Sequence, residues 1–174
     1  PDQCRHCQDP PCKGASSVEG AIIQDKASGA VIFTDKTVKE DYETIRGACP
    51  YDIPRKDPKT KRLVKCDMCI DRVRANRLPM CVKSCAMGAM NFGERADMLK
   101  LAEERLAAVK KEFPKAALLN KDEVAVIFLV ADEPKLYHKF AVAEADQRDG
   151  LMSRKSLLAG VFSPLVRAAR EMRG

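Results

Sequence analysis

The residues of this 174-residue chain that are best suited to chemistry are its eight cysteines. They are closely spaced, and each of two runs begins with Cys-x-x-Cys spacing. Thiolates are soft ligands that bind zinc, copper(I) and iron–sulfur clusters, so this spacing predicts metal sites. The cysteines are Cys4, Cys7 and Cys12 in the first run, a lone Cys49 before Pro50, and Cys66, Cys69, Cys81 and Cys85 in the second run.

Iron–sulfur clusters fit this spacing better than disulfides or zinc. Disulfide frameworks are typical of short secreted chains. Structural zinc usually takes two separate pairs of cysteines, which the second run could supply, but the first run packs three thiolates into nine residues. Cys-x-x-Cys runs completed by a distant Cys-Pro are typical of [4Fe–4S] clusters of the bacterial ferredoxin type. In that arrangement the last cysteine of each run ligates the cluster of the other run.

Three stretches resemble a known family, the iron–sulfur subunits of molybdopterin oxidoreductases. They are C-R-H-C-Q-D-P-P-C from Cys4, G-A-C-P-Y-D-I-P from Gly47, and K-C-D-M-C-I-D-R with L-P-M-C-V-K-S-C-A-M-G-A-M from Lys65 onward. The resemblance covers residues 1–93. It implies a subunit that passes electrons to or from a catalytic partner containing molybdenum or tungsten. Members usually hold four [4Fe–4S] clusters in pairs.

The chain departs from the family pattern at the ligands of one cluster. The crossed rule assigns the three cysteines of the first run, together with Cys49, to one complete [4Fe–4S] site. The other cluster of that pair would need cysteines where the chain has none. Because all four ligands are missing together, we interpret the pattern as the loss of one whole cluster. The positions concerned hold Lys39, Tyr42, Ile45 and either Ser16 or Ser17.

The same rule divides the second run between two clusters. Cys66, Cys69 and Cys81 would share a second [4Fe–4S] cluster with a cysteine upstream of Pro1. Cys85 would belong to a third cluster whose other ligands also lie upstream. Alternatively, the four cysteines of this run close on a single metal site. We therefore expect two or three clusters per intact subunit, and three resembles the small subunit of soluble tungsten or molybdenum formate dehydrogenases.

The net charge of +6 does not indicate a nucleic-acid partner. That value treats cysteines as neutral, whereas a [4Fe–4S]2+ cluster with four thiolates carries −2, so two clusters would leave roughly +2. No stretch of the sequence approaches the ~20 apolar residues of a transmembrane segment. Of the two histidines, His6 lies between two ligands, and the resemblance implies that it packs near the cluster without binding it; we expect His138 at the surface or an interface.

We expect an α+β fold in three parts. Residues 1–95 form a ferredoxin-like [4Fe–4S] core, residues 96–140 a helix–strand layer packed on it, and residues 141–174 an extended C-terminal helical tail. The tail combines an apolar face with basic residues. We expect it to dock on the catalytic partner, with a membrane surface as the alternative.

Local patterns place elements within these parts. Ser28–Gly29 between two short apolar runs predicts a β-hairpin. From Ala96 onward, apolar residues recur every three or four positions, which predicts a helix with Asp97 in its first turn and Pro114 at its end. The apolar run 123–130 predicts a buried strand. The apolar positions of the helix are Leu99, Ala102, Leu106, Val109 and Phe113.

The predicted function is electron transfer, because the sequence has no nucleophile–base pair and no Gly-rich phosphate loop. The resemblance implies a relay between a large tungsten or molybdenum molybdopterin subunit, most like that of formate dehydrogenase, and an external carrier such as a cytochrome. The alternatives are a subunit of a nitrate, dimethyl sulfoxide, thiosulfate or polysulfide reductase, a free ferredoxin-like carrier, and a zinc-stabilised binding module. The resemblance also implies a periplasmic location, with the cytoplasm as the alternative.

Overall fold

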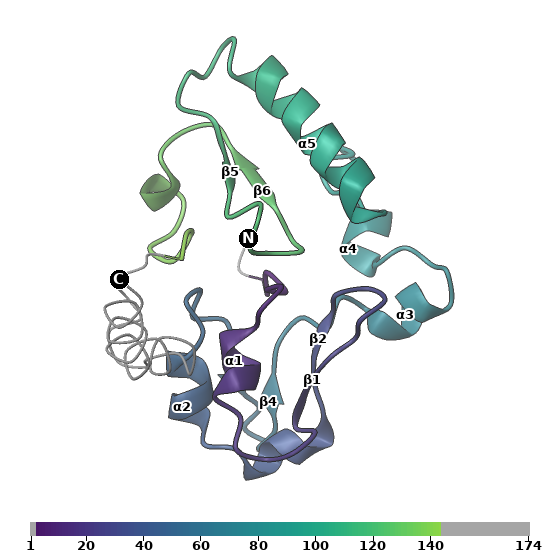
Figure 1. Ribbon diagram of the computed structural model, residues 1–174, viewed down its shortest axis with the longest axis vertical. Coiled ribbons are helices and arrows are strands. Elements are labelled where there is room, and N and C mark those ends of the chain that lie inside the picture. The colour runs from purple at the N-terminus through teal and green to yellow at the C-terminus, as the bar shows by residue number, and fades with distance from the viewer. Residues whose placement is uncertain (1–2, 144–174) are drawn as a thin grey trace, which may run out of the picture. The chain divides into compact units, whose positions relative to one another are not determined.

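The computed structural model describes residues 3–143, which belong to one compact unit (Figure 1). In this part of the chain, short helices accompany three two-stranded antiparallel sheets, as expected for an α+β protein. No helix within residues 3–143 is long and apolar enough to cross a membrane. Most of the predicted C-terminal tail, residues 144–174, lies outside the described residues.

The predicted hairpin is confirmed. Strand β1 (Ile22–Gln24) pairs antiparallel with β2 (Val31–Phe33). The turn between them closes with a 2.8 Å hydrogen bond from the Gly29 N–H to the Asp25 carbonyl. Gly29 has a φ of +72°, a conformation that residues other than glycine rarely adopt, so glycine is favoured at this turn.

Two short helices position two of the predicted ligands, Cys12 and Cys49. Helix α1 (Pro11–Gly14) begins with a proline. Proline suits this position because the first N–H of a helix has no partner within the helix, so its absence costs no hydrogen bond. Helix α2 (Tyr42–Gly47) is capped by Asp41, whose carboxylate accepts a 2.7 Å hydrogen bond from a first-turn N–H. Cys12 lies inside α1, and Cys49 follows α2. The helix positions therefore fix two of the predicted ligands.

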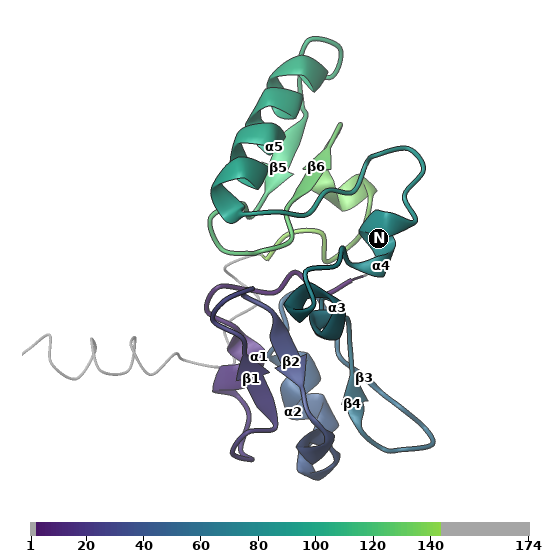
Figure 2. The ribbon, with the colours of Figure 1, turned by 90° about the vertical axis from the view of Figure 1, so that its right-hand side faces the viewer.

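The remaining elements of the cysteine-rich part are short (Figure 2). A 3-10 helix (Asp35–Lys39) leads from β2 to α2, and β3 (Arg55–Lys56) pairs with β4 (Leu63–Val64) in a second hairpin. Helices α3 (Ile70–Arg74) and α4 (Met80–Lys83) follow; Cys69 directly precedes α3, Cys81 lies in α4, and Cys66 and Cys85 lie outside both helices.

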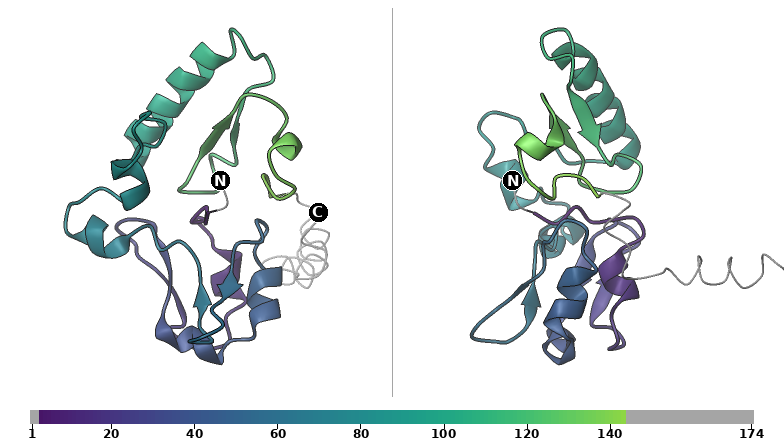
Figure 3. Two further views of the ribbon diagram at one scale, coloured as in Figure 1. Left: turned by 180° about the vertical axis from the view of Figure 1, so that it is seen from behind. Right: turned by 90° about the vertical axis from the view of Figure 1, so that its left-hand side faces the viewer.

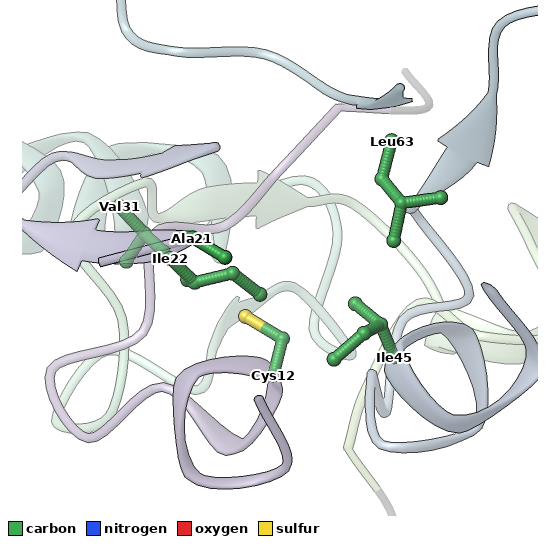
Figure 4. Packing of buried hydrophobic residues seen from close by; sticks show 6 residues of the cluster. All are labelled: Cys12, Ala21, Ile22, Val31, Ile45 and Leu63. Atoms are coloured by element: carbon green, nitrogen blue, oxygen red, sulfur yellow. The ribbon is translucent and has the colours of Figure 1, made fainter. Parts of the chain in front are cut away.

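A small hydrophobic core lies among α1, α2 and the two hairpins (Figure 4). It takes one side chain from α2 and one from β4, and strands β1 and β2 supply two more. A predicted ligand, Cys12, is itself a member, so the ligand and the core are placed by the same packing. The buried members are Cys12, Ala21, Ile22, Val31, Ile45 and Leu63.

The predicted helix is confirmed as α5 (Arg95–Val109), which lies along the β5–β6 hairpin (Figure 3). It ends before the predicted Phe113, because the hydrogen bonds at Lys111 and Glu112 tighten to the i→i+3 pattern and unwind the helix. Phe113 is 44% exposed. The apolar positions within α5 are half-buried and none of its residues is fully buried, so the helix covers the layer without entering a core.

The prediction of one strand over residues 123–130 is wrong. Only β6 (Phe128–Val130) pairs with a strand, the unpredicted β5 (Ala117–Leu119). The residues before β6 bind the first Cys-x-x-Cys loop instead: Val124 forms a bridge with Cys7, and the N–H groups of residues 125 and 126 donate to the Arg5 carbonyl at 3.1 and 2.9 Å. The apolar run is divided between two partners, which residue type alone does not reveal. A 3-10 turn, Pro134–Leu136, follows.

Replacing Ile45 with alanine should destabilise the cysteine-rich part. Ile45 is fully buried, so the change removes packed methylene groups and leaves a cavity, which costs roughly 2–4 kcal/mol. Thermal unfolding followed by circular dichroism measures the effect. Ile23→Ala is the matched control, since Ile23 is 39% exposed; equal losses in the two variants would contradict the placement of the core.

Candidate metal centre

The two Cys-x-x-Cys loops share one backbone geometry. In the first loop His6 has a φ of +47°, and its N–H donates to Cys4 Sγ at 3.4 Å. In the second loop Met68 has a φ of +65°, and its N–H donates to Cys66 Sγ at 3.4 Å. Residues other than glycine seldom adopt positive φ, and such conformations cluster at functional sites. Here they turn main-chain donors toward sulfur, which favours the thiolate.

Four cysteines from separate segments line one cavity. The first loop supplies two of them, α1 supplies the third, and the segment after α2 supplies the fourth. Most of the remaining lining is proline and apolar side chains, and its charged members are Arg5 and Lys65. The structure therefore brings together the four residues that the crossed rule groups as ligands of one cluster: Cys4, Cys7, Cys12 and Cys49.

The thiols surround space instead of converging on a point. Within residues 3–143, no group of three or more His, Cys, Asp or Glu side chains is arranged to hold a single metal ion. A polynuclear cluster differs from a single ion in that its thiolates bind separate iron atoms at its corners. The arrangement of the four thiols around a cavity suits such a cluster.

Burial disfavours thiolates in this cavity unless positive charge compensates them. Burial, with a smaller contribution from the charges of Cys4 and Cys49, raises the pKa of Cys7 and the pKa of Cys12 to about 12. Burial also raises the pKa of Cys49. Metal coordination overrides these shifts, because a coordinated thiol is deprotonated outright. The cavity thus requires cations near its sulfur atoms.

Arg5 is a buried cation without an acidic partner in the described residues. Its guanidinium donates to the main-chain carbonyls of Leu119 at 2.9 Å and Val126 at 2.8 Å. It also lies 5.3 Å from the ring centre of Tyr51 and 3.9 Å from that of Phe128. Burial lowers the pKa of Arg5, and nearby Tyr51 and cysteines oppose that shift. A buried charge is costly unless it is paired, so this cavity also requires negative charge.

Lys65 is the second cation of the cavity lining. Its Nζ donates to the main-chain carbonyls of Val31 and Cys66, the latter at 3.0 Å, and lies 4.8 Å from the ring centre of Phe33. Although burial dominates and raises the pKa of Cys12, the Lys65 charge acts in the opposite direction. Lys65 therefore lies close enough to Cys12 to favour the ionised form of that thiol.

The residues present fit a [4Fe–4S] cluster. Four thiols supply one ligand for each iron, and the lining contains two cations and no carboxylate. A [4Fe–4S]2+ cluster with four thiolates carries about −2, which matches the two positive charges. The donor set and the charge balance thus agree.

His6 packs among these segments and uses one ring nitrogen there. It is fully buried, its Nδ1 accepts a 3.0 Å hydrogen bond from the Val31 N–H, and burial lowers its pKa to about 3. The ring is therefore neutral, with its proton on Nε2. Nε2 has no hydrogen-bond partner among the described residues.

The second run is more open than the first. Cys81 is exposed in α4, and Cys69 directly precedes α3. Burial raises the pKa of Cys66, and the charge of Cys4 adds to that effect. Cys66 therefore lies near the first ligand set. Hydrogen bonds from main-chain N–H groups, that of Met90 first, lower the pKa of Cys85. Cys85 does not line the four-thiol cavity.

At the positions where the sequence predicts a lost cluster, Lys39 is exposed, and the other side chains are packed or hydrogen-bonded. Ile45 is fully buried in the core and Tyr42 packs against that core. Ser16 Oγ and Ser17 Oγ both donate to the Glu40 carboxylate, which also accepts hydrogen bonds from the N–H of Ser17 at 3.2 Å and of Val18 at 2.9 Å. Packed apolar groups and one carboxylate thus take the place of thiolates.

These features define a ferredoxin-type iron–sulfur protein, and comparison with known proteins identifies its family. Residues 1–95 match the family described as "4Fe-4S dicluster domain". The chain is 53% identical over 146 residues to the formate dehydrogenase subunit beta of Megalodesulfovibrio gigas, covering 82% of this chain and 68% of that protein. It is also 53% identical to the formate dehydrogenase 2 subunit beta (cytochrome c-553) of Nitratidesulfovibrio vulgaris, covering 81% and 67%.

A more distant relative has the same role in its name. The nitrate-inducible formate dehydrogenase iron-sulfur subunit of Escherichia coli is 41% identical over 143 residues, covering 79% of this chain and 48% of that protein. The chain belongs to the family of formate dehydrogenase beta subunits, which are iron–sulfur subunits. This membership confirms the prediction of an electron-transfer subunit with a ferredoxin-like [4Fe–4S] domain.

Sequence reasoning missed three charged residues that the site uses. Arg5 lies between two ligands, Lys65 immediately precedes a ligand, and Glu40 lies beside the positions of the missing cysteines. Adjacency to a cysteine run was a signal for Arg5 and Lys65, and adjacency to Lys39, a position where the family pattern has cysteine, was the signal for Glu40. It did not reveal that Arg5 reaches across to β5 and β6, since that depends on tertiary packing.

Replacing Glu40 with glutamine should destabilise the protein by roughly 2 kcal/mol near neutral pH, because charged hydrogen bonds are lost. Burial raises the pKa of Glu40, but its hydrogen bonds from Ser16, Ser17 and Val18 outweigh that effect and lower the pKa below the ordinary 4.5. The ionised carboxylate therefore adds stability above about pH 4.5, and that contribution is lost as the pH falls through the folded-state pKa.

Thermal unfolding by circular dichroism at pH 7 and pH 4 tests this account of Glu40. The difference between the native protein and Glu40→Gln should shrink at the lower pH. Glu43→Gln is the control, since Glu43 is exposed on the neighbouring helix and should show little change at either pH. A Glu40→Gln deficit that is the same at both pH values would contradict a role for the ionised carboxylate.

Proposed function

We propose that this chain relays electrons in a formate dehydrogenase through a [4Fe–4S] cluster held by Cys4, Cys7, Cys12 and Cys49. The observation that carries the proposal is their shared cavity, whose charged lining residues are both cations. When bound, such a cluster accepts and releases one electron at a time. The protein's part is to hold the thiolates, balance their charge and exclude water.

The second run serves two further clusters in this proposal. Cys66, Cys69 and Cys81 act together, and Cys85 acts separately. The crossed pattern of ligands supports this division, and the resemblance of the two Cys-x-x-Cys loops supports a ligand role for Cys66 and Cys69. Cys66 lies close to the first ligand set, which favours electron transfer between adjacent sites.

The partner is proposed from the relatives' names. Their beta subunits belong to formate dehydrogenases, so the electron donor is a catalytic subunit that oxidises formate at a tungsten or molybdenum molybdopterin. The name of one relative includes cytochrome c-553, which supports a cytochrome as the external acceptor. We also propose a periplasmic location, by resemblance to the family, which fractionation of the native cells would test.

Replacing Cys49 with alanine should remove one cluster signal from the low-temperature EPR spectrum of the reduced holoprotein. The cavity would then have three thiols and lose its fourth iron ligand. Cys85→Ala is the matched comparison, because it removes a thiol assigned to a different cluster, and it should abolish a different signal. If both variants lose the same signal, or if Cys49→Ala loses none, the ligand assignment is wrong.

Formate should reduce the clusters in the purified complex with the catalytic subunit. The expected result is partial bleaching of the visible absorbance within the mixing time of the experiment, with no change in the isolated beta chain. Nitrite, sulfide or other donors in place of formate provide the comparison. If another donor bleaches the absorbance and formate does not, the result would support an electron-transfer role and contradict the assignment to formate dehydrogenase.

A further inference from the structure

Lys65 is held in place entirely by uncharged groups. Its Nζ donates to the carbonyls of Val31 and Cys66, and Phe33 presents its ring at 4.8 Å. No ion pair joins Lys65 to an acidic side chain in residues 3–143. Hydrogen bonds fix the position of the ammonium group, but they leave its full positive charge to act on the cavity that it lines.

Val31 connects Lys65 to the first Cys-x-x-Cys loop. The Val31 carbonyl accepts from Lys65, while the Val31 N–H donates to His6 Nδ1 at 3.0 Å. Lys65 also immediately precedes Cys66 and binds its carbonyl at 3.0 Å. One fixed cation therefore lies between the two loops that carry the first ligands of neighbouring sites.

A fixed cation at this point favours reduction of the adjacent site. Adding one electron to a [4Fe–4S]2+ cluster with four thiolates changes the charge of the site from about −2 to about −3. A neighbouring positive charge stabilises the more negative form, and burial limits screening by water and salt. The effect is on the equilibrium between the two oxidation states, so it appears as a reduction potential.

We propose that Lys65 raises the reduction potential of the cluster at Cys4, Cys7, Cys12 and Cys49, an inference that rests on the proposed electron-transfer function. Lys65 is a positioning residue for charge and does not ligate iron. The side chain lines the four-thiol cavity, and its charge also acts on the Cys66 thiol, so a shift at the site of Cys66 can accompany the shift at this site.

Arg5 lines the same cavity but has a second role. Its guanidinium holds the carbonyls of Leu119 and Val126, so it also joins the ligand loop to the β5–β6 layer. A substitution at Arg5 would alter packing and charge together. Lys65 is therefore the position at which the charge can be changed with the least disturbance of the fold.

The test is an EPR-monitored redox titration of the holoprotein, following the signal that Cys49→Ala removes. Lys65→Met and Lys65→Gln remove the charge, and glutamine retains a hydrogen-bond donor. Lys65→Arg keeps the charge. Lys59→Met is the matched control for a lysine-to-methionine change, since Lys59 is exposed in the turn between β3 and β4. Iron content is measured for every variant.

In both neutral variants, the ratio of reduced to oxidised cluster at a fixed potential should fall roughly tenfold, which for a one-electron couple is about 59 mV. Lys65→Arg and Lys59→Met should stay close to the native protein. If Lys65→Met fails to retain iron, Lys65→Gln decides the matter. An unchanged midpoint in an iron-loaded neutral variant, or a shift confined to the other clusters, would overturn the proposal.

Failure of the proposed function would look different. It would appear as a native protein without iron, or as one that has no signal dependent on Cys49. If the native protein shows that signal and the neutral Lys65 variants keep the native midpoint potential, the proposed electron relay stands. Only the proposed role of Lys65 is then wrong.

Discussion

The concentration of four thiolates in one buried cavity is the constraint on which the rest of the structure depends. Burial raises the pKa of Cys7, Cys12 and Cys49, so the ionised forms of these three thiols require iron and nearby cations. Arg5 and Lys65 supply positive charge from the protein, and both are held by main-chain carbonyls and aromatic rings. Because Arg5 binds carbonyls near β5 and β6, the charge requirement of the cavity also fixes the layer that follows the ferredoxin-like part.

The predicted loss of a cluster would leave a volume to be filled and a set of main-chain donors to be satisfied. In this chain Ile45 and Tyr42 contribute to the packing, and Ile45 belongs to the same core as the ligand Cys12. Glu40 accepts hydrogen bonds from the main chain and hydroxyls at Ser16–Val18. On the prediction that a cluster was lost here, the Glu40 carboxylate would replace its negative charge and apolar packing its bulk.

Sequence spacing was sufficient to group Cys4, Cys7, Cys12 and Cys49, because ligand order along the chain follows a simple crossed pattern. It also located the first hairpin, where Gly29 must adopt positive φ, and helix α5, where apolar residues recur with helical spacing. It did not divide residues 123–130 correctly, because the partners of that segment lie about 120 residues away at Arg5 and Cys7. The roles of Lys65 and Glu40 were hidden for the same reason: a charged residue next to a motif has no visible partner until the chain is folded.

Anomalous diffraction from crystals of the holoprotein, recorded at the iron absorption edge, tests the central claim most directly. We predict a compact iron peak bounded by the sulfur atoms of Cys4, Cys7, Cys12 and Cys49, and no iron peak beside Ile45 and Glu40. A peak at the zinc edge in the four-thiol cavity, an absence of iron there, or iron at the Ile45 position would contradict the account.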